Sequence, residues 1–67
     1  MAYCRFDGTS DVYLYASVSG NYVFHILGEL EDVVVKTPKQ ALSKLRELRQ
    51  RGLRIPDSAF ERLEQEL

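Results

Sequence analysis

The hydrophobic pattern of this chain changes its period once, near Thr37, and this change constrains the fold more than any other feature. Before it, residues 11–18 alternate between the two sides of a strand and are rich in β-branched and aromatic types. After it, Ala41, Leu45 and Leu48 recur at the helical spacing. A block of strands followed by a block of helices predicts an α+β fold.

The first half is expected to form a small antiparallel sheet of three to four strands. The expected strands cover residues 3–6, 11–18, 22–27 and 32–36. The turn signal Ser19-Gly20-Asn21 leaves two registers open. A three-residue loop would place Val12, Leu14 and Val18 with Phe24 and Ile26. A two-residue loop at Gly20-Asn21 would swap the pairing, because a shift of one residue exchanges the faces.

The second half is expected to form two helices that pack on one face of this sheet. Thr37 can cap the first helix, Pro38 fits its first turn, and Gly52 is typical of the residue after a helix end. Asp57 or Ser58 is expected to cap the second helix. Thirty-one residues in two short helices can cover one face of a small sheet more easily than two.

No catalytic, metal-binding or cofactor-binding motif is evident, so we expect a protein that is not an enzyme and holds no metal or cofactor. Cys4 is the only cysteine and His25 the only histidine among 67 residues. A zinc site needs about four ligands, and a Cys–His nucleophile pair needs a group that orients the histidine. A buried thiol and a strand-surface imidazole are the simpler interpretation.

Both faces of the predicted hairpin are apolar, which points to a contact surface on whichever face the helices leave uncovered. Large exposed apolar patches mark interaction sites, and tyrosine is enriched at interface cores. Half-exposed strand tyrosines, or one helix on each face, would be the alternative. The candidate surface consists of Tyr13, Tyr15, Val23, His25 and Leu27.

Charge is strongly segregated along the chain although the net charge is only −1. Residues 36–54 carry seven basic side chains and one acidic one, between two acidic segments. A basic helix over residues 38–51 therefore predicts nucleic-acid binding as the alternative function. The second helix is acidic, which argues against a helix-turn-helix reading. The basic candidates are Lys39, Lys44, Arg46, Arg49, Arg51 and Arg54.

The sequence resembles small proteins of actinobacteria and their phages. The resemblance is carried by Arg5-Phe6, Ser10–Tyr15, the Gly20 turn with Tyr22-Val23, and the second-half pattern Thr37-Pro38, Ala41-Leu42, Leu45, Leu48, Gly52, Ile55-Pro56 and 59–63. These are core and turn residues, so the resemblance concerns fold more than chemistry. The group has no assigned activity. A phage setting would imply a small protein that binds a host or phage protein.

These inferences combine into one expectation for the whole chain. Residues 1–67 form a single α+β domain, with the sheet in 1–36 and a helical hairpin in 37–67. The expected function is a non-catalytic protein-interaction module that binds a protein partner or a second copy of itself. No span approaches the ~18 apolar residues of a membrane helix, and no secretory signal is visible, so a cytoplasmic location is expected, in the host cytoplasm if the protein is phage-encoded.

Overall fold

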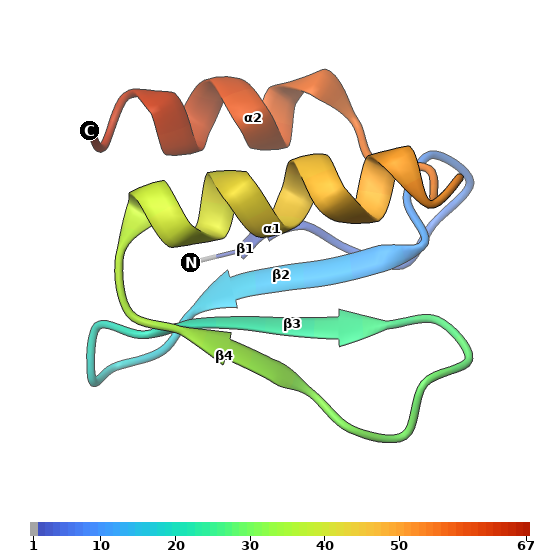
Figure 1. Cartoon of the computed structure of the whole chain (residues 1–67), viewed down its shortest axis with the longest axis horizontal. Helices are drawn as coiled ribbons and strands as arrows, with labels where there is room; N and C mark the ends of the chain where they lie inside the picture. Colours follow the sequence, from blue (N-terminus) through green and yellow to red (C-terminus); the bar gives the residue numbers. More distant parts are fainter. Residues whose placement is uncertain (1) are drawn as a thin grey trace.

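The computed structural model describes residues 2–67 as one antiparallel sheet followed by two helices (Figure 1). The elements are β1 (Ala2–Cys4), β2 (Val12–Ala16), β3 (Tyr22–Ile26), β4 (Val33–Val35), α1 (Pro38–Gln50) and α2 (Asp57–Glu64). The strands pair in chain order, β1-β2-β3-β4, and every pair is antiparallel. The predicted α+β fold, sheet first and helices last, is confirmed.

Ser17 and Asn21 close the turn between β2 and β3 around residues 18–20, one residue earlier than the expected Ser19-Gly20-Asn21 loop. The pairing of faces expected for a three-residue loop is correct. The Ser17 N–H donates to the Asn21 carbonyl at 2.8 Å and closes the loop. Leu14 pairs with Phe24, and Val12 pairs with Ile26. Val18, however, lies in the loop and is fully exposed, so its predicted place in the strand is wrong.

Both helices pack on the same face of the sheet, as predicted. Val12, Leu14, Phe24 and Ile26 point to this face and are 0–4% exposed. Because strand side chains alternate, Tyr13, Tyr15, Val23 and His25 point to the other face. From the helices and the loop between them the core receives Ala41, Leu42, Leu45, Leu48, Ile55, Ala59 and Leu63.

The ends of α1 follow the sequence signals, whereas the start of α2 does not. The Gln40 N–H donates to Thr37 Oγ1 at 3.1 Å, as expected of a cap. Gly52 has φ +95° just after the helix, a conformation that glycine adopts without strain. The predicted cap of α2 at Asp57 or Ser58 is wrong, because the helix begins at Asp57 behind Pro56 and has no side-chain cap.

The C-terminal end of α2 is fastened to β1 and β3. The hydroxyls of Tyr3 and Tyr22 both donate to the Glu66 carboxylate, the second at 2.6 Å. The Arg62 guanidinium lies over the Tyr3 ring at 5.3 Å and donates to the Ala2 carbonyl at 2.9 Å. One edge of the sheet is therefore covered by α2.

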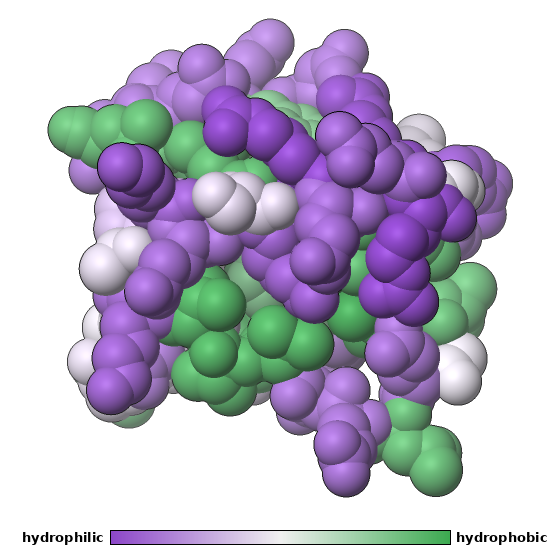
Figure 2. All heavy atoms as spheres, viewed as in Figure 1, coloured by the Kyte–Doolittle hydropathy of each residue, from purple (hydrophilic) through white to green (hydrophobic). Residues whose placement is uncertain are grey.

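The surface is divided between a hydrophilic band and smaller apolar areas. Figure 2 shows hydrophilic residues over the helices and hydrophobic residues gathered over the strands β3 and β4 below them. No helix within residues 2–67 is long and apolar enough to cross a membrane.

Candidate interaction surface

The face of the sheet that points away from the helices carries the sequence-predicted interaction residues. Tyr13 and Tyr15 come from β2, and Val23 and His25 come from β3. Tyr13 pairs with His25 and Tyr15 with Val23, so the four side chains form a compact square. All four are half-buried by one another although no helix covers them. We call this surface the open face.

The rings of the open face make a continuous network of contacts. Tyr13 meets Tyr15 edge to face, with ring centroids 5.4 Å apart. His25 stacks on Tyr15 at 5.6 Å, and its edge meets Tyr13 at 5.9 Å. Such pairs hold their rings in place. The open face therefore presents aromatic rings that pack against one another.

An acidic residue on the approach to β4 orients the histidine. The Asp32 carboxylate contacts Nδ1 of His25, and both side chains remain more than a third exposed. The contact follows from the register, because Val23 pairs with Val34 and the next position on the same side brings His25 opposite residue 32. Asp32 was not among the predicted residues, since a Val-Val-Val run does not reveal its register.

Apolar side chains extend the open face on three sides. Phe6 lies beyond β1 and contacts the Tyr13 ring at 6.1 Å while remaining 46% exposed. Val34 of β4 is 55% exposed beside Val23. Leu27, which was predicted, follows β3 and is 62% exposed. Phe6 and Val34 were missed because the sequence places neither in a hairpin of known register.

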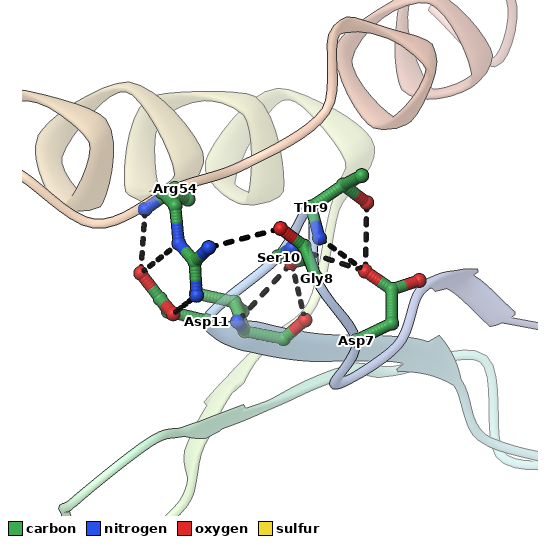
Figure 3. A network of polar contacts seen from close by, with 7 residues as sticks. Asp7, Gly8, Thr9, Ser10, Asp11 and Arg54 are labelled. Atoms are coloured by element: carbon green, nitrogen blue, oxygen red, sulfur yellow. Dashed lines mark hydrogen bonds and ion pairs between the residues drawn. The ribbon is translucent and has the colours of Figure 1, made fainter.

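A polar network joins the β1–β2 loop to the loop between the helices (Figure 3). Both carboxylate oxygens of Asp11 accept from the Arg54 side chain, at 2.9 and 3.3 Å, and the Arg54 side chain also donates to the Gly8 carbonyl at 2.9 Å. The hydrogen bonds from Arg54 lower the pKa of Asp11. Asp7 accepts from Thr9 and the Ser10 N–H, and these bonds lower its pKa too. The network holds the loop that leads into β2.

The predicted basic residues are not assembled into one free patch. Lys44 pairs with Glu47 and Arg49 with Asp57, at 2.5 and 2.6 Å. Arg51 pairs with Glu29 at 3.5 Å and Arg54 with Asp11. Within residues 2–67, only Lys39 and Arg46 of the six candidates make no ion pair. Intramolecular pairing leaves less charge for phosphate contacts.

The structure does not bring Cys4 and His25 together. Cys4 is buried on the helix side of β1, and burial raises the pKa of its thiol. His25 lies on the open face of β3, two strands away. Among residues 2–67, no three potential ligands lie close enough to hold a metal ion.

Comparison with known proteins gives no relative from which a role could be transferred. No family model, no curated protein and no solved structure matches this chain. The resemblance to small actinobacterial and phage proteins stays a prediction.

Proposed function

We propose that this protein is a non-catalytic protein-interaction module and that it contacts its partner through the open face. The observation that carries the proposal is the packed cluster of Tyr13, Tyr15 and His25 on the face that both helices leave uncovered. Aromatic side chains held in place lose little conformational freedom on binding, and they dominate the energetics of protein interfaces. A host or phage protein is the partner class suggested by the resemblance.

The distribution of charge supports a protein partner over a nucleic acid. Surfaces that stack bases combine aromatic rings with basic side chains that contact the phosphates. Here the six basic candidates belong to α1 and the loop after it, whereas the polar neighbour of the open-face rings is the Asp32 carboxylate. The rings and the six basic candidates are thus on different sides of the molecule. Nucleic-acid binding by the basic helix is the alternative outcome of the test.

The test is a comparison of captured proteins among three tagged versions of the chain. Tyr13→Ser with Tyr15→Ser removes the centre of the open face, and Lys39→Ser with Arg46→Ser is the matched control on the helix side. Each is used to capture binders from a lysate, with and without nuclease, and the recovered proteins are quantified by mass spectrometry.

We expect one protein to be recovered with the wild type and the control, and to fall about tenfold or more with the tyrosine variant. Nuclease should not change this recovery. Circular dichroism should show that both variants remain folded, because the buried core lies on the other face. Equal recovery with a folded tyrosine variant, or recovery that depends on nucleic acid and is lost in the control, would reject the proposal.

A further inference from the structure

The two edges of the sheet differ, and only one of them is covered by a helix. At the β1 edge, Arg62 binds the Ala2 carbonyl and α2 packs alongside. At the β4 edge, the strand is three valines. It is short, which is one device that natural edge strands use against pairing, but it carries no proline, bulge or charge and no helix or loop covers it within residues 2–67. In Figure 1, β4 is the strand farthest from α2.

The hydrogen-bonding phase shows which groups of β4 face outwards. The Ser17 N–H bonds the Asn21 carbonyl, and the Leu27 N–H bonds the Asp11 carbonyl. The backbone N–H and C=O groups of the odd-numbered residues in and beside β3 therefore point towards β2. Tyr22 and Phe24 therefore face β4, where they pair with Val35 and Val33. The N–H and C=O of Val34 point away from the sheet, and no side chain within residues 2–67 bonds them.

The residues on either side of β4 make this edge complementary to itself. The sequence reads Asp32-Val33-Val34-Val35-Lys36. The acidic Asp32 lies two residues before Val34, and the basic Lys36 lies two residues after it. In an antiparallel pair of identical strands centred on Val34, Asp32 of each copy faces Lys36 of the other. Opposite charges in facing positions stabilise a strand pair, and like charges destabilise it.

We propose that a second copy of this chain pairs with β4 through a two-fold axis at Val34, which joins two sheets into one of eight strands. The outward N–H and C=O of Val34 in one copy form hydrogen bonds with those of Val34 in the other copy. In the same way, the backbone groups of residue 32 in each copy bond those of residue 36 in the other. The Lys36 N–H, now held by Gln40 Oε1 at 2.9 Å, exchanges that acceptor for a backbone carbonyl.

Space on the helix side of β4 fits this arrangement. A groove lined by Val35 and the α1 residues Lys39, Gln40, Ser43, Lys44 and Glu47 runs beside the strand. Val33 and Val35 point to that side and are only half-buried. On the other side, Val34 of each copy meets Val34 of the second copy, so the two open faces become continuous. The pairing uses the edge, not the open face, and does not depend on the proposed function.

The register is tested by exchanging charges between copies. Asp32→Lys places two lysines opposite each other in a homodimer, and Lys36→Asp places two aspartates opposite each other. An equimolar mixture of the two variants forms a heterodimer in which both contacts are attractive again. Sedimentation across a dilution series measures the dimer dissociation constant for the wild type, each variant and the mixture.

We expect the wild type to dimerise, each variant to dimerise about tenfold more weakly or worse, and the mixture to recover wild-type affinity within a few-fold. Asp32→Lys also removes the contact between Asp32 and His25 within one chain. Mixing the two variants does not restore that contact, so a weaker dimerisation caused only by its loss would persist in the mixture. A monomeric wild type, unchanged variants or an unrescued mixture would overturn the pairing.

A backbone variant provides the second test. Val34→Pro removes an N–H that the monomer does not use, and proline is tolerated in such positions of edge strands. Val34→Thr keeps the N–H and is the control. We expect the proline variant to be folded and monomeric and the threonine variant to be dimeric. If instead Tyr13→Ser with Tyr15→Ser abolishes dimerisation while Val34→Pro does not, the copies meet through the open face, which rejects the edge pairing and leaves the proposed function standing.

Discussion

Among single residues, Asp11 shows how one carboxylate can fix two loops. Its oxygens bind the Arg54 side chain and the Arg54 N–H, and its own N–H donates to the Arg54 carbonyl at 2.9 Å. This small pairing ties residue 54, between the helices, to the start of β2. The open face depends on it indirectly, because β2 carries both tyrosines.

The lowered pKa of Asp11 predicts a dependence of stability on acid. A carboxylate whose pKa is lower in the folded state stabilises that state above its unfolded pKa, ~3.9, and the contribution disappears as pH falls through the folded pKa. Between pH ~5 and ~2, urea denaturation should therefore show a steeper loss of the free energy of unfolding for the wild type than for Asp11→Asn. Glu61→Gln, which removes a carboxylate that makes no bond within residues 2–67, should retain the wild-type slope. Equal slopes for all three proteins would contradict the role of Asp11.

The phenol of Tyr3 predicts the opposite dependence at high pH. Burial, and then the hydrogen bond to Glu66, raise the pKa of Tyr3, and the bond to Glu66 raises that of Tyr22. Raised pKa values stabilise the folded state below the unfolded pKa, ~10, and this contribution is lost as pH rises through the folded values. Tyr3→Phe with Tyr22→Phe should flatten the alkaline loss of stability measured by urea denaturation. Tyr15→Phe, on the open face, should not flatten it.

Among the elements, α1 depends on the residue that ends it. Gly52 has φ +95°, and nothing lies within 4 Å of the position that a Cβ would take. The cost of Gly52→Ala is therefore conformational, about 1–2 kcal/mol in the free energy of unfolding. Gly8→Ala is the matched control, because its surroundings are equally open and its φ is not positive. Similar losses for the two variants in thermal or urea denaturation would show that the left-handed conformation is not what matters.

The types of the elements follow from the sequence, whereas the register of the central hairpin stays open between two alternatives and is given by the structure. Alternation places Tyr13 and Tyr15 on one face of β2, and the observed register, in which Tyr13 pairs with His25, brings His25 to the same face. At β1, a register irregularity between Ala2 and Cys4 buries the neighbours Tyr3 and Cys4 together, so no alternating pattern predicts where Phe6 lies.

The choice between the two faces of the sheet could not be read from the sequence because both are apolar. The structure resolves it through the aliphatic side, where Leu14 and Phe24 are fully buried against the helices. The side rich in tyrosine stays open, since phenol hydroxyls buried under a helix would each need a partner. Tyr3 and Tyr22, which do lie on the helix side, have that partner in Glu66.

For the whole molecule, the fold separates three surfaces with different chemistry. The helices carry five of the nine basic side chains, and two of these five, Lys44 and Arg49, make ion pairs. The open face carries the aromatic cluster. The β4 edge carries unpaired backbone groups between an aspartate and a lysine. Two of these three surfaces, the open face and the β4 edge, are suited to contact with other chains, which is a large share of the surface of so small a domain.

Site-specific photo-crosslinking from the open face shows directly whether this face contacts a protein partner. A benzophenone amino acid replaces Tyr15 in one version of the chain and Arg46, on the exposed side of α1, in another. Both are irradiated in the same lysate, treated with nuclease and analysed by mass spectrometry. We expect a protein adduct from position 15 that is absent from position 46. An adduct only from position 46, or nucleic acid attached there and nothing at position 15, would contradict the claim that the open face is the contact surface.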